Sequence, residues 1–136
     1  MNRRTLAAIV YGLAFVWIGI LHWVEPERFV AIMPPYFGAP KFWVLLTGVT
    51  EILLGLGIMW PRFRRPAAIW MMIQLACLYL ANLHMWRADL AFEGVRLGTT
   101  GHIARLVVQI ALILAASVIG EVWPWTAFAR WRGRRR

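Results

Sequence analysis

Cysteine and acidic residues are scarce in this chain. It has one cysteine in 136 residues, and six Asp and Glu stand against 15 Lys and Arg. Because Cys77 is the only thiol, the chain can form neither an intrachain disulfide nor a CxxC redox pair. The sequence also lacks a cluster of metal ligands and a haem motif. These absences argue against thiol, metal and haem chemistry, and we predict no metal site.

Charged residues are few, whereas apolar residues make up 61% of the chain. A water-soluble domain of this length has no interior large enough to hide so much apolar surface. The basic residues stand between long apolar runs and not along one face of an amphipathic helix. We therefore predict a membrane protein whose acidic partners are lipid headgroups, with no nucleic acid partner.

Four apolar runs approach the ~20 residues that a helix needs to cross a hydrocarbon layer ~30 Å thick. They cover residues 6–24, 42–60, 67–86 and 103–123. Arg105 and Gln109 interrupt the start of the fourth run, but an Arg near a helix end can extend its side chain to the headgroups. We expect an all-α fold, a membrane-embedded antiparallel four-helix bundle formed by a single domain over residues 1–136.

Basic residues are unevenly distributed between the two sides of this predicted bundle. The side with both termini holds ten of the Lys and Arg residues, and the opposite side holds five. Because basic loops favour the cytoplasm, we predict that both termini are cytoplasmic, in the plasma (bacterial inner) membrane. The Arg-rich tail 124–136 should bind anionic headgroups there, with about 1 kcal/mol for each Arg near the surface.

The connection after the first run contains several prolines. Pro26 can begin a short helix at the membrane interface, with Phe29, Ile32 and Met33 on one apolar face. The Pro-rich segment 34–40 cannot continue a helix, because proline has no N–H and pushes the preceding residue into an extended conformation. We expect this segment to cap the outer mouth of the bundle.

An acidic residue, Glu51, lies in the middle of the second run. A charge at that depth costs about 2.5–3.5 kcal/mol, so the side chain should face the bundle interior or be protonated. Four further polar side chains fall in the outer half of the membrane: His22, Asn82, Arg105 and Gln109. We interpret these five residues as a site that opens outward.

Each of these residues also has a structural explanation. His22 can be a solvated residue at the membrane boundary, and Arg105 can bind phosphate headgroups. Asn82 and Gln109 can form hydrogen bonds that hold helices together. Glu51 can belong to a structural ion pair or hydrogen bond with Arg105 or Asn82.

Five segments give the sequence a resemblance to a known family. They are GILHWVEPERF (19–29), MPPY with the later Pro40 (33–40), GVTEILLGLG (48–57), ANLHM (81–85) and RLVVQ (105–109). In this order they resemble the DoxX-like family of small four-helix membrane proteins. That family is named for a membrane subunit linked to thiosulfate oxidation with quinone as acceptor. Relatives of similar shape act as biogenesis factors for redox enzymes or help to assemble other membrane proteins.

The resemblance and the polar residues together suggest a redox-associated membrane component. His22, Asn82, Arg105 or Gln109 would hold the carbonyl oxygens of a quinone or another hydrophobic ligand, and Glu51 would exchange the proton that accompanies reduction. The alternative is a non-catalytic factor that assembles a membrane partner or forms a homo-oligomer. A carrier of lipids or small solutes is a third hypothesis. The sequence leaves open whether the protein is an enzyme.

Overall fold

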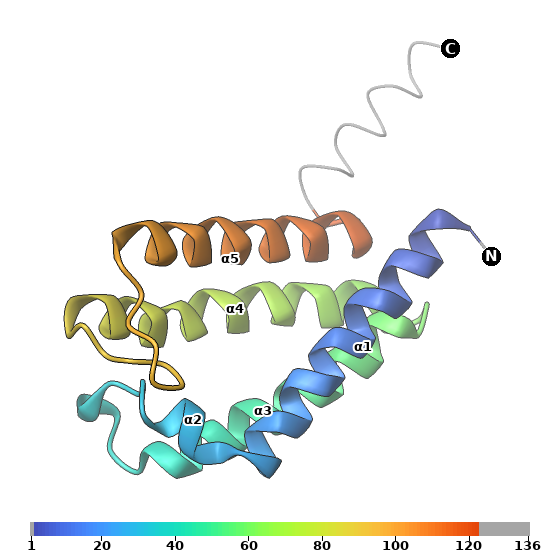
Figure 1. Cartoon of the computed structure of the whole chain (residues 1–136). Coiled ribbons are helices and arrows are strands. Elements are labelled where there is room, and N and C mark those ends of the chain that lie inside the picture. Colours follow the sequence, from blue (N-terminus) through green and yellow to red (C-terminus); the bar gives the residue numbers. More distant parts are fainter. Residues whose placement is uncertain (1, 123–136) are drawn as a thin grey trace.

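The structure, a computed structural model, describes residues 2–122. Its elements are α1 (Arg3–Val24), α2 (Pro26–Val30), the 3-10 turn η1 (Pro35–Phe37), α3 (Pro40–Met59), α4 (Arg64–Arg87) and α5 (Thr99–Ile119) (Figure 1). Within these residues the only β-type pairing is an isolated bridge between Phe92 and Val95. The all-α prediction is confirmed, and α1, α3, α4 and α5 are each long and apolar enough to cross a membrane.

All four long helices begin before the apolar runs, and α1 and α3 do so at residues that suit helix starts. The Asn2 side chain accepts a hydrogen bond from the backbone N–H of Thr5 at 2.8 Å and so caps α1. Pro40 occupies the first position of α3, where its missing N–H costs no helical hydrogen bond. Hydropathy marks the apolar centre of such a helix and misses its polar first turn.

The fourth long helix, α5, is displaced from its expected position. The apolar run predicted a helix over 103–123, whereas α5 begins at Thr99 and ends at Ile119. Its first turn is polar, and Gly120 follows as its C-terminal cap. The basic tail 124–136, to which the sequence assigns lipid binding, lies outside the described residues.

A buried arginine shapes the turn between α3 and α4. The guanidinium of Arg64 donates hydrogen bonds to the carbonyls of Ile58 at 3.0 Å and Met59 at 3.4 Å. These carbonyls belong to the last turn of α3, where no further helical N–H is available. Arg64 is therefore the first residue of α4, and its side chain caps the C-terminus of α3.

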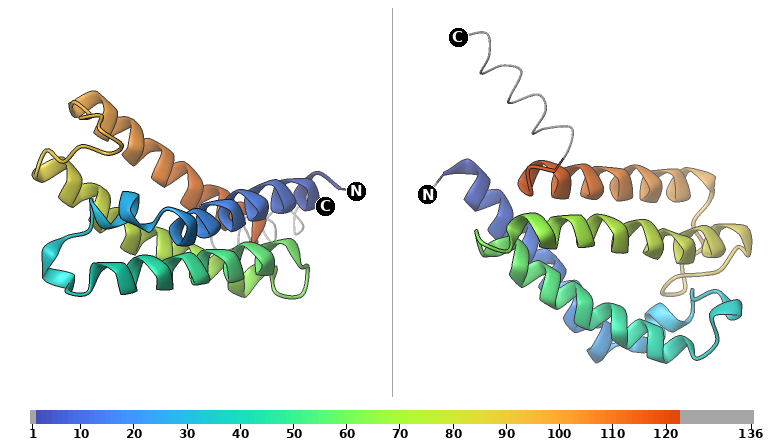
Figure 2. Two further views of the ribbon diagram at one scale, coloured as in Figure 1. Left: turned by 60° about the horizontal axis from the view of Figure 1, so that its bottom comes forward. Right: turned by 180° about the vertical axis from the view of Figure 1, so that it is seen from behind.

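The four long helices form two side-by-side pairs, α1 with α3 and α4 with α5. Figures 1 and 2 show the pairs inclined to each other, so that they diverge toward the end that holds α2, η1 and the connection 88–98. We call this end the α2 end. The opposite end is closed by Arg4, whose guanidinium hydrogen-bonds the Ile119 carbonyl and pairs with Glu121.

Glycines bring α1 and α3 into backbone contact. A Cβ atom at Gly12 would lie 2.5 Å from the carbonyl oxygen of Gly55, and one at Gly19 would lie 2.6 Å from that of Gly48. No side chain fits in such a gap. The two contacts are seven residues apart on each helix, so they recur on the same face, as small residues do where membrane helices pack closely.

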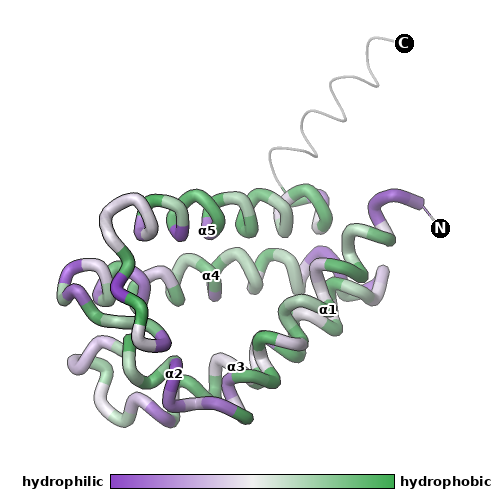
Figure 3. Tube along the Cα trace, in the orientation of Figure 1, coloured by the Kyte–Doolittle hydropathy of each residue, from purple (hydrophilic) through white to green (hydrophobic). Residues whose placement is uncertain are grey.

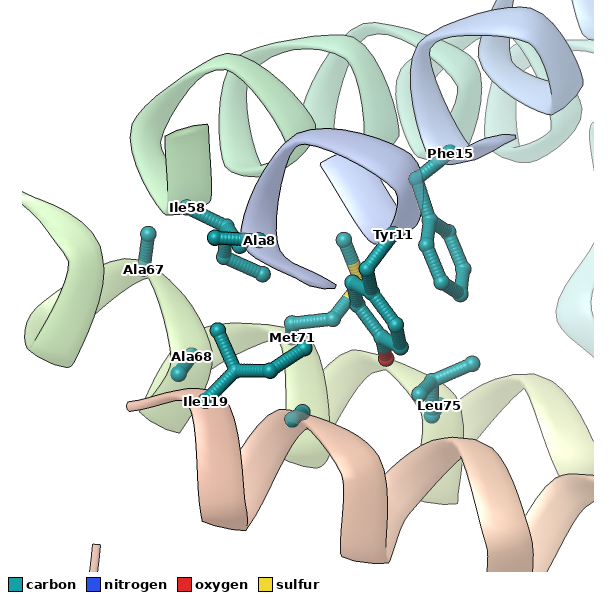
Figure 4. Close-up of a cluster of buried hydrophobic side chains, with 10 residues drawn as sticks. Ala8, Tyr11, Phe15, Ile58, Ala67, Ala68, Met71, Leu75 and Ile119 are labelled. Atoms are coloured by element: carbon teal, nitrogen blue, oxygen red, sulfur yellow. The ribbon is translucent and has the colours of Figure 1, made fainter. Parts of the chain in front are cut away.

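Side chains, not backbone contacts, join the two helix pairs. Tyr11, Phe15, Met71 and Leu75 belong to a buried apolar cluster between them (Figure 4). The Tyr11 hydroxyl also donates a hydrogen bond to the Leu112 carbonyl of α5 at 3.0 Å. The pairs are therefore held together mainly at the end away from α2.

Apolar side chains also cover the outside of the helices. Figure 3 shows apolar segments along all four long helices and polar segments gathered at their ends and in the connections. Trp17, Trp70 and Val107 are 61%, 62% and 60% exposed. A monomer in water rarely leaves so much contiguous apolar surface uncovered.

The glycine contacts predict a specific sensitivity to added side chains. Gly55→Ser should lower the melting temperature in detergent, because its Cβ would meet the Gly12 carbonyl oxygen at 2.6 Å and overpacking costs about 1–3 kcal/mol. Gly98→Ser is the matched control, because nothing lies within 4 Å of a Cβ there. Equal melting temperatures for the two variants would contradict the close packing of α1 on α3.

Candidate functional site

A cavity of about 250 Å³ lies at the α2 end, between the diverging helix pairs. All five residues that the sequence analysis selected line it: His22, Glu51, Asn82, Arg105 and Gln109. They come from four different helices. The remaining lining is mainly aliphatic and aromatic, so the cavity combines an apolar wall with a few polar groups, as small-molecule sites usually do.

Glu51 is the most deeply buried of the polar residues, with only 2% of its surface exposed. Its Oε2 atom lies 3.2 Å from Nδ1 of His22. The proton on Nδ1, however, is directed to the Ile18 carbonyl at 2.9 Å, which can only accept. Among the described residues, Oε2 therefore has no hydrogen-bond partner. A buried acceptor left in this way costs about 1–3 kcal/mol.

The partner of Glu51 differs from those that the sequence suggested. Neither Arg105 nor Asn82 forms an ion pair or hydrogen bond with Glu51 in the described part of the chain, and His22 lies beside it instead. The contact follows from the glycine packing. A Cβ at Gly48, one turn before Glu51, would lie 2.7 Å from Cβ of His22.

Two contacts fix the position of the His22 ring, one at its edge and one at its face. Nδ1 is bonded to the backbone of its own helix, and the ring stacks on Phe29 of α2 with centroids 3.7 Å apart. His22 is 5% exposed. It is therefore a packed residue of the cavity wall and not a solvated residue at a boundary.

Arg105 lies at the edge of the cavity without an acidic partner among the described residues. Its guanidinium carbon lies 5.0 Å from the centroid of the Phe92 ring, a cation–π contact. One Nη1–H points to the sulfur of Met85 at 3.0 Å, which is a weak acceptor. The remaining donors of Arg105 are available to a ligand.

The two amide residues have different roles. Gln109 donates from Nε2 to the Leu75 carbonyl at 2.5 Å and so links α5 to α4. Asn82 is half-buried, and in the described part of the chain its side chain makes no hydrogen bond. Gln109 therefore matches the structural explanation, whereas Asn82 has unused donors and an unused acceptor in the cavity.

The roof of the cavity differs from the one that the prolines suggested. Phe29, Ile32 and Met33, which the sequence placed on one apolar face, line the cavity, but no residue of the Pro-rich segment 34–40 does so. Phe92, from the connection between α4 and α5, completes the roof. The sequence analysis did not identify Phe92 as a residue of the site.

The position of Phe92 depends on long-range contacts. Its backbone pairs with Val95 in a tight turn, and its ring meets that of Phe29 edge to face at 6.4 Å. Arg28 of α2 forms an ion pair with Glu93 of the same turn at 2.7 Å. Only the aromatic character of Phe92, in a connection that holds no other aromatic residue, could have indicated its role from the sequence.

A second hollow lies beside the cavity, on the outer surface between α4 and α5. A shallow groove of about 340 Å³ on that surface is lined by Asn82, Ala104, Arg105, Val108 and Gln109. Three of these residues, Asn82, Arg105 and Gln109, also line the cavity. These three residues therefore lie between the cavity and the groove.

Within residues 2–122, no three His, Cys, Asp or Glu side chains are grouped so that they could hold a metal ion. The carboxylate of Glu51 has only His22 as a titratable neighbour among the described ion pairs. The site is thus defined by hydrogen-bonding groups and apolar contacts.

These features define a protein of four long apolar helices with a mainly apolar cavity at one end that holds a few polar groups. The chain belongs to a family described as a domain of unknown function (DUF8561), whose model matches residues 11–120. No curated protein and no solved structure matches the chain. The resemblance to the DoxX-like family stays a hypothesis beside this membership.

The different bonding of the two amides gives a prediction. Gln109→Leu should lower the free energy of unfolding by about 0.6–1.7 kcal/mol, because it removes a hydrogen bond between helices. Asn82→Leu, which removes no hydrogen bond seen in the structure, should leave stability unchanged. Thermal unfolding in the same detergent measures both. A larger loss for Asn82→Leu than for Gln109→Leu would show that the amides are misassigned.

Proposed function

We propose that this chain is an integral membrane protein that binds the headgroup of a quinone-like, lipophilic molecule in its cavity. In this proposal the four long helices cross the bilayer as an antiparallel bundle, with the termini in the cytoplasm and the α2 end outside. The exposed apolar surface of the helices supports the membrane location. The excess of basic residues on the side of the termini supports the orientation.

The size of the cavity supports a ligand with one substituted ring. A cavity of roughly 150 Å³ is enough to hold benzene. The 250 Å³ of this cavity therefore leaves room for a six-membered ring with small substituents. Aromatic and aliphatic walls from Phe29, Phe92 and Leu78 suit the faces of such a ring.

The polar groups support a ligand that carries oxygen atoms. Arg105 and Asn82 offer N–H donors that the described part of the protein does not fully use. Quinone carbonyls accept hydrogen bonds of this kind. Glu51 lies on the opposite helix pair, where it would exchange the proton that accompanies quinone reduction.

The groove between α4 and α5 supports a long apolar tail on the ligand. In the proposed orientation this face is turned to the lipid, so a tail could pass Ala104 and Val108 into the bilayer while the ring stays inside. The observation that carries the proposal is a mainly apolar cavity with a few polar groups, next to a groove on this face that shares three of its lining residues. A water-soluble substrate would not need such a groove.

Reduction of a quinone needs an electron donor, and the chain has neither a cysteine pair nor a haem motif. The protein would therefore serve as the quinone-binding subunit of a redox system, with a membrane protein partner as the source of electrons. The basic tail 124–136 would anchor it at anionic headgroups.

Ligand binding can be tested with the full chain in detergent and a short-tailed benzoquinone, followed by calorimetry. Wild type should bind, and Arg105→Gln should weaken binding about tenfold or more, because a hydrogen bond from a charged donor contributes about 1.5–3 kcal/mol. Arg96→Gln is the matched control, because Arg96 pairs with Asp89 in an exposed connection outside the cavity.

Two outcomes of this titration would contradict the proposal. One is an equal effect of the two Arg substitutions. The other is the absence of binding by folded wild type; if a membrane protein then co-purified in constant ratio, the assembly function would be the better explanation.

The membrane orientation can be tested by labelling single cysteines. In a Cys77→Ser background, Arg96→Cys should react with a membrane-impermeant maleimide in right-side-out vesicles, because it lies at the α2 end. Arg62→Cys, in the turn between α3 and α4, should react only after the membrane is permeabilised. The reverse pattern would invert the orientation, and labelling of both positions in sealed vesicles would argue against a membrane-spanning bundle.

A further inference from the structure

The carboxyl group of Glu51 lacks a donor although several donors lie nearby. The His22 Nδ1–H is used by the Ile18 carbonyl, and the Thr47 hydroxyl donates to the Val44 carbonyl at 2.9 Å. On the far wall, the Gln109 amide donates to the Leu75 carbonyl. The His22 and Thr47 donors are therefore used by backbone carbonyls, and Oε2 of Glu51 has no hydrogen-bond partner among the described residues.

The opposite wall of the cavity has unused hydrogen-bond donors. Arg105 has N–H groups that face no acidic residue of the described chain, and Asn82 makes no hydrogen bond there. Both residues line the same cavity as Glu51, yet no ion pair joins Arg105 to Glu51 across it. The cavity thus has an acceptor on α3 and donors on α4 and α5, with space between them.

A ligand that satisfies the unused hydrogen-bonding groups of both walls needs a hydrogen-bond donor at one end and an acceptor at the other. An oxidised quinone has carbonyl oxygens at both ends and no donor. A reduced, dihydroxy ring has a hydroxyl at each end, and a hydroxyl both donates and accepts. When the Glu51 carboxyl group is ionised and can only accept, the reduced form alone satisfies both Glu51 and the Arg105 and Asn82 donors.

We propose that the cavity binds the reduced, dihydroxy form of a quinone-like ring in preference to the oxidised form, with one hydroxyl donating to Glu51. This inference rests on the proposed function and adds the form of ligand that the site selects. The second hydroxyl oxygen accepts from Arg105 or Asn82. A tenfold preference for the reduced form raises the potential of the bound two-electron couple by about 30 mV.

The preference can be measured on wild type alone, with three ligands that share one substituted ring. They are the hydroquinone, the corresponding benzoquinone and the hydroquinone dimethyl ether, each titrated anaerobically into the full chain in detergent. The ether keeps both oxygens but has no O–H. We expect the hydroquinone to bind about tenfold more tightly than either of the other two, because only it donates to Glu51.

A variant assigns the preference to Glu51. Glu51→Gln introduces an amide N–H that can donate to a carbonyl oxygen of the quinone. The ratio of the hydroquinone affinity to the quinone affinity should therefore fall toward one. Glu27→Gln, at an exposed carboxylate outside the cavity, should keep the wild-type ratio. The melting temperature reports whether each variant is folded.

The outcomes separate this inference from the proposed function. Binding of all three ligands with equal affinity would overturn the preference. A preference that Glu51→Gln does not change would overturn its assignment to a hydrogen bond with Glu51. Either result would leave the proposed quinone site intact. If none of the three ligands binds to folded wild type, the proposed function fails and the preference with it.

Discussion

The backbone contact between α1 and α3 is the constraint on which the rest of the structure depends. Gly12 meets Gly55 and Gly19 meets Gly48, so the two helices approach more closely than any side chain would permit. The second contact lies one turn before His22 in α1 and one turn before Glu51 in α3. It therefore decides that a histidine, and not the more distant Arg105, lies beside the buried carboxyl group.

The two helix pairs meet through side chains, and this difference in packing makes room for the cavity. Around Tyr11 and Met71 the pairs are closed by buried apolar residues, whereas toward α2 they diverge. The space is roofed by Phe29 and Phe92 from two separate connections. The unpaired acceptor of Glu51 is an energetic cost within this space. Local costs of this kind are expected at functional sites, where the ligand supplies the missing partner.

The sequence predicted well what depends on position along a helix. Four apolar runs gave four long helices, and the depth of Glu51, Asn82 and Arg105 grouped residues that line one cavity. It predicted less well what depends on rotation about a helix axis and on contacts between connections. The neighbour of Glu51 follows from helix rotation, and the roof formed by Phe92 follows from a turn that packs against α2. The glycines of α1 and α3 are each spaced seven residues apart in the sequence, but this spacing does not say which two helices pair. The turn that holds Phe92 leaves no pattern in hydropathy.

The central claim is that the cavity between Glu51 and Arg105 holds the ring of a lipophilic ligand. A crystal structure with a brominated benzohydroquinone tests it most directly, because the anomalous signal of bromine locates the ring without reference to the protein. We expect a peak inside the cavity, with a ring oxygen within hydrogen-bond distance of the Glu51 carboxyl group. Peaks confined to grooves on the outside of the helices, for example beside Trp60 and Trp70, with an empty cavity would contradict it.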